Sequence, residues 1–377
     1  MKFLHTSDLH IGKRLYDASL LDDQRYILKE IIKIAVEEKV DAILISGDVY
    51  DKPIPQADAV TVFDNFVTLL ADEKIKVFMI SGNHDSAQRL DFMSSMLKKE
   101  DIYFCGSYKG YLEKVTLTDD YGNLNVYMLP FIKPSSVRQF DENAEITSYE
   151  SAVKYVFDHT EINENERNVV LSHQFITGAS VDDSEELIVG GLDNISADIY
   201  SKFDYVALGH IHGRQKIGKG NVIYSGTPLK YSFSEACHDK SVTIVEFKNS
   251  NDSVISTRPL KPLHEMRKIE GKFEELMLLN DSEDYIKVVL TDENDVIDAM
   301  LKLRTKFPNA LTLEYNNTRT KQYNNIIKES VKSIGTPIEM FEKLYEKQMN
   351  QPLSDEQRKI VMSLIKKIWG GEDVCDL

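Results

Sequence analysis

Residues 76–85 read Lys76-Val77-Phe78-Met79-Ile80-Ser81-Gly82-Asn83-His84-Asp85, an apolar run followed by polar residues. The apolar run has the length and composition of a short buried strand. The last four residues therefore place an amide, an imidazole and a carboxylate at the carboxyl end of a strand, which is the edge where open α/β sheets bind ligands. Taken alone, these four residues favour an ordinary polar turn, because Gly, Asn and Asp are common turn formers.

Four further predicted strands, over 2–7, 41–46, 168–172 and 204–208, end in polar residues of the same kinds. The side chains at these ends are Asp8 and His10, Asp48, His173, and His210 and His212. Apolar residues at helical spacing over 20–39 and 55–72 separate the first three strands of the chain. The first 85 residues therefore predict a β-α-β-α-β series, in which parallel strands bring their carboxyl ends to one edge.

Carboxylate, imidazole and amide donors at one edge predict a site for two divalent cations. Buried carboxylates would repel one another, and each would cost several kcal/mol without a compensating charge. Mixed donors without cysteine suit Mn²⁺, Fe²⁺ or Zn²⁺. Pairs of such ions, roughly 3.5–4 Å apart, carry out in-line displacement at phosphorus. Asp48 is the expected bridging ligand because it is central in the order of the motifs.

His84 is expected to act on the substrate rather than on a metal. Because it follows Asn83, its ring can reach a phosphate or leaving-group oxygen and donate a hydrogen bond or a proton. Asp85 is expected to fix the tautomer of His84 and to act as the N-cap of a helix over 86–97. The alternative for His84 is a structural histidine of the turn. His5, inside the first strand, is expected in the core.

Composition and charge narrow the class of protein. The net charge of −16 argues against a protein that coats nucleic acid or membranes non-specifically. It still allows a nucleic-acid enzyme whose carboxylates hold cations. No apolar run approaches the length that crosses a membrane. The three cysteines are widely spaced, and residues 1–6 lack the features of a signal peptide. Reduced thiols and a cytoplasmic location are therefore expected.

The middle of the chain predicts additional strands. Short strands are expected at 102–104, 112–117 and 124–130, and these predict added antiparallel pairing. A helix is expected around 148–159. The polar stretch 174–194 is long for a loop inside a compact domain, and such loops are usually functional or mobile.

The last third of the chain predicts a small domain and a helical hairpin. Two prolines mark a linker at 259–262, and the sequence from 285 to 315 predicts a β-α-β unit. From 336 onward the apolar spacing is helical on both sides of a break, after which Ser354 and Gln357 fit a capping box. Such a hairpin either packs on its own domain or offers an apolar face to another protein.

The order and spacing of the motifs resemble the calcineurin-like metallophosphoesterase superfamily. The matching motifs are Asp8-x-His10, Gly47-Asp48, Gly82-Asn83-His84-Asp85, His173 and Gly209-His210-Ile211-His212. Three longer strings resemble the SbcD family of nuclease subunits within it. They are His5-Thr6-Ser7-Asp8-Leu9-His10-Ile11-Gly12, Ser46-Gly47-Asp48-Val49-Tyr50-Asp51 and Tyr224-Ser225-Gly226-Thr227-Pro228-Leu229.

This resemblance implies both a fold and a site. The fold is an α/β sandwich of the four-layer type, flanked by helices, with a small α+β capping domain and a C-terminal helical hairpin. The implied domains are 1–262 for the nuclease, 263–335 for the cap and 336–377 for partner binding. One metal ion would take Asp8, His10, Asp48 and His212. The second would take Asp48, Asn83, His173 and His210, and His84 would be the catalytic histidine.

The resemblance also implies an activity and partners. The family uses Mn²⁺ and cuts DNA in repair and recombination, as a 3′→5′ exonuclease on duplex ends and an endonuclease on single strands and hairpins. Its members form homodimers within heterotetramers that contain a coiled-coil ABC ATPase of the SbcC kind. The alternatives are a stand-alone metallophosphatase or phosphodiesterase for a small molecule or phosphoprotein, and a scaffold without activity. The extra domain and the hairpin favour the nuclease.

Overall fold

The computed structural model describes residues 1–181, 194–218, 220–249, 252–320, 337–349 and 351–369. The chain divides into two compact units. The first comprises Met1–Lys268, Asp281–Lys287 and Leu303–Thr312, and the second comprises Ile269–Asn280, Val288–Lys302 and Leu313–Leu377. The domain boundaries at 262 and 335 stay predictions. Among the described residues, no helix is both long and apolar enough to cross a membrane.

The first of two six-stranded sheets has the order β14-β13-β1-β4-β5-β6. Its parallel strands are β1 (Lys2–Thr6), β4 (Ala42–Ser46), β5 (Lys76–Ile80) and β6 (Ile102–Cys105). The strands β13 (Ser241–Asn249) and β14 (Asp252–Pro259) complete it in antiparallel pairing. The predicted β-α-β-α-β series is therefore confirmed. The expectation of antiparallel pairing was wrong for β6, which continues the parallel series beside β5.

The second sheet has the order β11-β12-β10-β9-β8-β7. Its strands are β7 (Glu113–Asp119), β8 (Gly122–Leu129), β9 (Arg167–His173), β10 (Tyr205–Gly209), β11 (Gln215–Ile217) and β12 (Val222–Tyr224). The hairpin of β7 and β8 is antiparallel, as predicted, whereas β8, β9, β10 and β12 run parallel. The carboxyl ends of these four parallel strands therefore lie at one edge of the second sheet.

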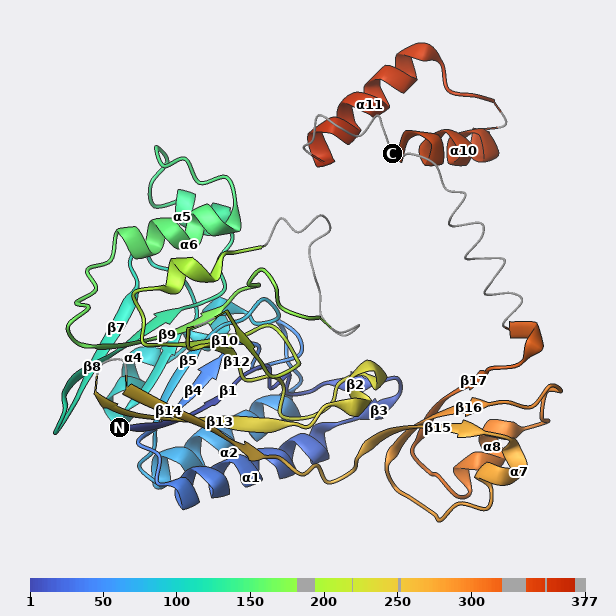
Figure 1. Ribbon diagram of the computed structural model, residues 1–377, viewed down its shortest axis with the longest axis horizontal. Coiled ribbons are helices and arrows are strands. Elements are labelled where there is room, and N and C mark those ends of the chain that lie inside the picture. The colour runs from blue at the N-terminus through green and yellow to red at the C-terminus, as the bar shows by residue number, and fades with distance from the viewer. Residues whose placement is uncertain (182–193, 219, 250–251, 321–336, 350, 370–377) are drawn as a thin grey trace. The chain divides into compact units, whose positions relative to one another are not determined.

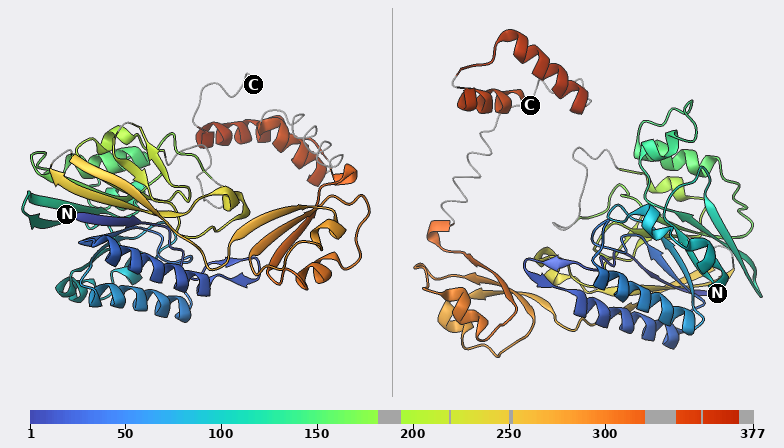
Figure 2. Two further views of the ribbon diagram at one scale, coloured as in Figure 1. Left: turned by 60° about the horizontal axis from the view of Figure 1, so that its bottom comes forward. Right: turned by 180° about the vertical axis from the view of Figure 1, so that it is seen from behind.

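The two sheets lie face to face, and helices cover both outer faces (Figure 1). The helices α1 (Leu21–Glu38) and α2 (Ala57–Asp72) cover the first sheet, and α5 (Pro134–Arg138) and α6 (Tyr149–Asp158) cover the second. Along β4, Leu44 packs between the sheets while Ile43 and Ile45 pack under the helices. Every residue of β4 is buried, which explains its uninterrupted apolar run over 42–45. The predicted four-layer sandwich is confirmed, and Figure 2 shows its layers from two further directions.

Buried polar contacts join the two sheets near their carboxyl ends. The Nδ1 atom of His5 lies 2.8 Å from the hydroxyl oxygen of Tyr205, and its Nε2 lies 3.2 Å from Oγ of Ser46. Ser46 in turn donates a hydrogen bond of 2.8 Å to the carbonyl of Ala207. His5 is fully buried, which confirms its predicted place in the core.

The predicted helix over 86–97 is wrong. The structure has two short helices here, α3 (Ala87–Leu90) and α4 (Ser94–Leu97). Between them, Met93 adopts a φ of 62°. This left-handed conformation cannot continue a right-handed helix, so the segment breaks in two.

The remaining elements are small. A three-stranded sheet has the order β15 (Met266–Gly271), β16 (Tyr285–Leu290) and β17 (Ala310–Tyr315), with the helices α7 (Phe273–Leu276) and α8 (Ala299–Arg304). The predicted β-α-β unit is present, although α8 is shorter than expected and β15 was missed. A two-stranded hairpin, β2 (Arg14–Leu15) and β3 (Ala18–Ser19), follows β1. The helices α10 (Pro337–Met349) and α11 (Asp355–Trp369) form the C-terminal hairpin.

Two further predictions concern local segments. The capping box is confirmed, because Gln357 N lies 3.3 Å from Oγ of Ser354 and Ser354 N lies 2.9 Å from Oε1 of Gln357. The predicted loop over 174–194 lies partly outside the described residues, at 182–193.

Candidate metal centre

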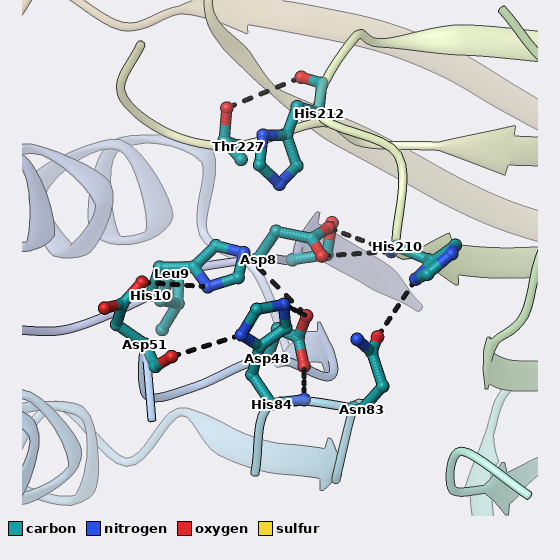
Figure 3. Close-up of polar contacts among 12 residues, drawn as sticks. Asp8, Leu9, His10, Asp48, Asp51, Asn83, His84, His210, His212 and Thr227 are labelled. Atoms are coloured by element: carbon teal, nitrogen blue, oxygen red, sulfur yellow. Dashed lines mark hydrogen bonds and ion pairs between the residues drawn. The ribbon is translucent and has the colours of Figure 1, made fainter. Parts of the chain in front are cut away.

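The polar residues after the strands of both sheets meet in one cluster (Figure 3), and most of their side chains are buried. The first sheet contributes Asp8 and His10 after β1, Asp48 after β4, and Asn83 and His84 after β5. The second sheet contributes His173 at the end of β9, and His210 and His212 after β10. The residues named from the sequence therefore lie together, and their roles as ligands remain a proposal.

Asp48 lies at the middle of the cluster. Its Oδ2 atom is 3.4 Å from Nε2 of His173, 3.8 Å from Nε2 of His10 and 4.0 Å from Nε2 of His84. Its Oδ1 atom accepts a hydrogen bond of 2.9 Å from the backbone N–H of His84. One carboxylate thus faces imidazoles from both sheets, which is the arrangement a ligand shared by two cations requires.

On one side of Asp48, ligand atoms of Asp8, His10 and His212 lie within 4.8 Å of one another. The carboxylate of Asp8 also accepts the backbone N–H of His210, at 3.0 Å to Oδ1 and 3.2 Å to Oδ2. All three potential ligands are almost completely buried. This group could hold one divalent cation together with an oxygen of Asp48.

On the other side, Oδ1 of Asn83 lies between two imidazoles. It is 3.0 Å from Nε2 of His173 and 3.0 Å from Nδ1 of His210. The opposite ring nitrogen of His173 donates a hydrogen bond of 2.8 Å to the carbonyl of Ser46, which fixes the ring. Asn83, His173 and His210 could therefore hold a second cation with Asp48.

The donor set fits divalent metal ions better than it fits an internal hydrogen-bond network. Within the described part of the chain, neither ring nitrogen of the buried His10 has a hydrogen-bond partner. Burial holds the pKa of His10 well below its ordinary value and lowers the pKa of His210 to about 3, so both rings are neutral at pH 7. Buried, neutral imidazoles beside carboxylates are the donors that metal ions use.

The backbone at the site is held in an uncommon conformation. Four of the cluster residues have positive φ, namely Asp8 at 53°, His10 at 43°, Asp48 at 49° and His210 at 101°. Residues other than Gly avoid this region. Each one held there costs on the order of 1–3 kcal/mol in conformational energy, and the conformation persists only where the surrounding structure enforces it. The sharp turns after β1, β4 and β10 thereby direct these side chains to one point.

The prediction that Asp85 fixes the tautomer of His84 is wrong. A backbone carbonyl orients the imidazole instead. Its Nδ1 atom lies 3.1 Å from the backbone carbonyl of Asp51. This carbonyl orients the ring with Nε2 toward Asp48. The sequence could not reveal the contact, because any residue at position 51 supplies a carbonyl.

Asp85 ties two loops together rather than capping a helix. Its carboxylate accepts the backbone N–H groups of Gly82 at 3.0 Å, Val49 at 3.0 Å and Tyr50 at 2.9 Å. The N-cap of α3 is Ser86, which makes no capping bond with its side chain. Asp85 therefore holds the loop after β5 against the loop after β4, and supports the site through the backbone.

Comparisons with known proteins place this arrangement in a family. Residues 1–214 match the family model described as calcineurin-like phosphoesterase, and residues 262–349 match that of the type 5 capsule protein repressor C-terminal domain. The SbcD subunit of the nuclease SbcCD from Staphylococcus epidermidis is 30% identical over 99% of this chain and 100% of its own length. This chain belongs to the SbcD family of calcineurin-like phosphoesterases. A second SbcD relative, from Staphylococcus saprophyticus, is 34% identical over 83% of this chain and 84% of its own.

Membership of the SbcD family confirms two predictions made from the motifs. The chain is a metal-dependent phosphodiesterase, and it is a nuclease subunit. Solved structures that resemble it include a dimetal phosphatase from Danio rerio, with 14% identity, a TM-score of 0.42, and coverage of 70% of this chain and 97% of that one. A protein from Thermus thermophilus has 13% identity, a TM-score of 0.39, and coverage of 68% and 98%. The assignment to the SbcD family depends on the sequence matches and not on these likenesses.

Proposed function

We propose that this chain cleaves DNA in the cytoplasm with two Mn²⁺ ions, as a 3′→5′ exonuclease on duplex ends and an endonuclease on single strands and hairpins. The observation that carries the proposal is the position of Asp48. One of its oxygens faces imidazoles from both sheets within 4.0 Å. Two divalent cations on either side of one carboxylate suit displacement at phosphorus.

The ligands divide into two sets about Asp48. Asp8, His10 and His212 would hold the first ion together with Asp48, since their donor atoms cluster. Asn83, His173 and His210 would hold the second, since the amide oxygen of Asn83 lies 3.0 Å from a nitrogen of each ring. Oxygen and nitrogen donors without thiolate suit Mn²⁺.

The side chains of the site divide the catalytic work. When bound, the cations would supply Lewis-acid stabilisation of charge on the phosphate and acidify water. His84 is the group placed to act on the substrate, because its side chain is 20% exposed whereas that of His10 is 2% exposed. With Nδ1–H donated to the carbonyl of Asp51, Nε2 is the nitrogen that can meet a phosphate or leaving-group oxygen.

A side-by-side assay on two substrates tests the proposal. With Mn²⁺, the chain should cleave a labelled DNA hairpin and a duplex end at rates that far exceed its hydrolysis of p-nitrophenyl phosphate. Chelation by EDTA should abolish cleavage, and added Mn²⁺ should restore it. Turnover of p-nitrophenyl phosphate alone, with both DNA substrates intact, would contradict the proposal and favour a small-molecule phosphatase.

We further propose that the C-terminal hairpin binds an SbcC-like coiled-coil ATPase, in a heterotetramer that contains two copies of this chain. The hairpin displays apolar side chains, with Phe341 41%, Leu344 57%, Ile360 60% and Leu364 50% exposed. Amphipathic helices with open apolar faces commonly dock into grooves of a partner. The relatives are named as one component of the nuclease SbcCD, which supports such a partner.

Substitution on the apolar face should separate partner binding from catalysis. Leu344→Glu combined with Leu364→Glu should abolish co-purification with the ATPase and leave the Mn²⁺ content unchanged, as should deletion of 336–377. Lys343→Glu introduces the same side chain at a charged position of α10 and should retain the partner. Unchanged co-purification in the double variant and the deletion would refute this surface as the binding site.

A further inference from the structure

A buried acidic residue lies behind His212, on the side away from the metal centre. The Nδ1 atom of His212 is 3.2 Å from Oε1 of Glu235, whose side chain is fully buried. A carboxylate can only accept a hydrogen bond, so the ring donates from Nδ1. The ring is directed toward Asp8 (Figure 3), and Nε2 then presents its lone pair on that side.

Other contacts hold the carboxylate of Glu235 in a single position. Its Oε2 atom lies 2.6 Å from Nζ of Lys240 and accepts a bond of 3.3 Å from the hydroxyl of Thr227. Its Oε1 atom accepts the backbone N–H of Tyr231 at 3.3 Å. A buried carboxylate needs such an ion pair to offset its desolvation. Glu235 therefore presents a fixed acceptor to the ring of His212.

The backbone of His212 is held by the same network. Its carbonyl accepts hydrogen bonds from Nζ of Lys240 at 3.0 Å and from the backbone N–H of Thr227 at 3.1 Å. Gly226 permits this approach, because a Cβ atom there would lie 2.6 Å from the same carbonyl oxygen. The string Ser225-Gly226-Thr227 thus fixes the main chain at His212 while Glu235 fixes the ring.

Two other histidines of the cluster are oriented by neutral groups. His173 and His84 each place Nδ1 against a neutral backbone carbonyl, of Ser46 and Asp51 respectively. His212 faces an anion at the corresponding position. A carboxylate behind a ligating imidazole makes the ring a stronger electron-pair donor to the metal and selects its tautomer. Glu235 thus distinguishes the side of the site that contains His212.

We propose that Glu235, paired with Lys240, is a positioning residue that sets the affinity of the metal ion shared by Asp8, His10 and His212. The second ion, which Asn83 and His173 would hold, should not depend on it. This inference rests on the two-metal function proposed above. Partners of this kind behind a ligating histidine typically change metal affinity by about 10- to 100-fold.

Titration of the full chain with Mn²⁺ tests the inference. Glu235→Gln keeps the size of the side chain but removes its charge and turns an amide toward Lys240. In calorimetry, the variant should bind one of the two Mn²⁺ ions about 10- to 100-fold more weakly and the other with unchanged affinity. In electron paramagnetic resonance at limiting Mn²⁺, the signal of a coupled ion pair should give way to that of an isolated ion.

Glu113→Gln is the matched control. Glu113 is also a buried glutamate, 8% exposed, and it pairs with Lys98 at 3.1 Å and Lys109 at 2.8 Å. Its replacement removes a similar ion pair from the same compact unit. We expect it to lower thermal stability and to leave both Mn²⁺ affinities unchanged. Damage to the fold is thereby separated from damage to one metal site.

The outcomes distinguish the inference from the proposed function. If Glu235→Gln binds both ions like the unmodified chain, or if Glu113→Gln weakens Mn²⁺ binding equally, the positioning role is wrong and the two-metal function stands. If the unmodified chain binds fewer than two ions, both fail. If Glu235→Gln does not fold, Glu235→Asp decides, because it keeps the charge for Lys240 and withdraws it from His212. Unchanged affinity for both ions in Glu235→Asp would then overturn the inference.

Discussion

Replacing Asp48 by Asn should lower DNA cleavage by about three orders of magnitude or more and leave the two sheets folded. Asparagine has nearly the same shape, and its oxygen can still accept the backbone N–H of His84. It also tolerates the φ of 49° at this position. The substitution removes the negative charge that would lie between two cations. Elemental analysis should therefore show a loss of Mn²⁺ along with the loss of cleavage of a labelled hairpin.

Asp101→Asn is the matched control for this substitution. Asp101 also has positive φ, at 58°, but its side chain is 51% exposed and pairs with Lys76 outside the cluster. The same chemical change in the same backbone conformation should leave cleavage and Mn²⁺ content unchanged. Near-normal activity of Asp48→Asn would rule out a bridging role for Asp48.

His84→Gln completes the comparison, because it separates substrate chemistry from metal binding. We expect it to retain two Mn²⁺ ions and to lose about 10²- to 10⁴-fold in turnover, as when a positioned acid or base is removed. The alternative has a structural basis, since a nitrogen of His84 clusters with ligand atoms of His10 and Asp48. Loss of a metal ion together with turnover would make His84 a ligand.

Replacing Gly209 by Ala should produce the second large effect, on stability. A Cβ atom at Gly209 would lie 1.9 Å from the carbonyl oxygen of Ser46 and 2.8 Å from Nδ1 of His173. This carbonyl oxygen and Nδ1 of His173 form the hydrogen bond that joins the two sheets at the metal centre. Backbone atoms cannot rotate away, so the sheets must separate locally. We expect a decrease of about 3 kcal/mol in the free energy of unfolding, measured by urea denaturation, and weaker binding of Mn²⁺.

Gly220→Ala serves as the control for Gly209→Ala. A Cβ atom at Gly220 would meet Val222 Cγ2 at 3.9 Å, which is an ordinary contact. This substitution should change the free energy of unfolding by no more than about 0.5 kcal/mol. If Gly209→Ala behaves like Gly220→Ala in both stability and Mn²⁺ binding, the close approach of the sheets at Gly209 is not essential.

Much of the fold could be predicted from local pattern. The strand over 42–46 is apolar at 42–45 because helices cover one of its faces and a second sheet covers the other, and this leaves a clear signal in sequence. The errors fell where tertiary structure decides. The conformation of Met93 breaks the helix predicted over 86–97. The pairing of β6 depends on a neighbour, β5, and not on its own sequence.

The site was predictable in its residue types but not in its supporting contacts. Metal-type donors after a strand are visible in sequence because the backbone places them at a known edge. By contrast, Asp85 binds backbone N–H groups from a different loop, and a backbone carbonyl orients His84. Glu235 lies beside His212 from a short 3₁₀ helix, Phe233–Cys237, which is outside the motifs quoted from the sequence. Such contacts depend on how different loops pack against one another, and the local spacing of residues does not predict this packing.

The sequence by itself determined the order of strands and helices over the first 85 residues, which form part of the first sheet and its covering helices. It also determined which polar residues follow each strand. These features are local, because hydrophobic periodicity and turn chemistry act over a few residues. Tertiary structure alone decided that two sheets stack with their strand ends together, so that Asp48 meets His173 across the interface. It also decided which groups orient each imidazole. Those contacts join residues far apart in the chain, and the packing of buried side chains between the sheets selects them.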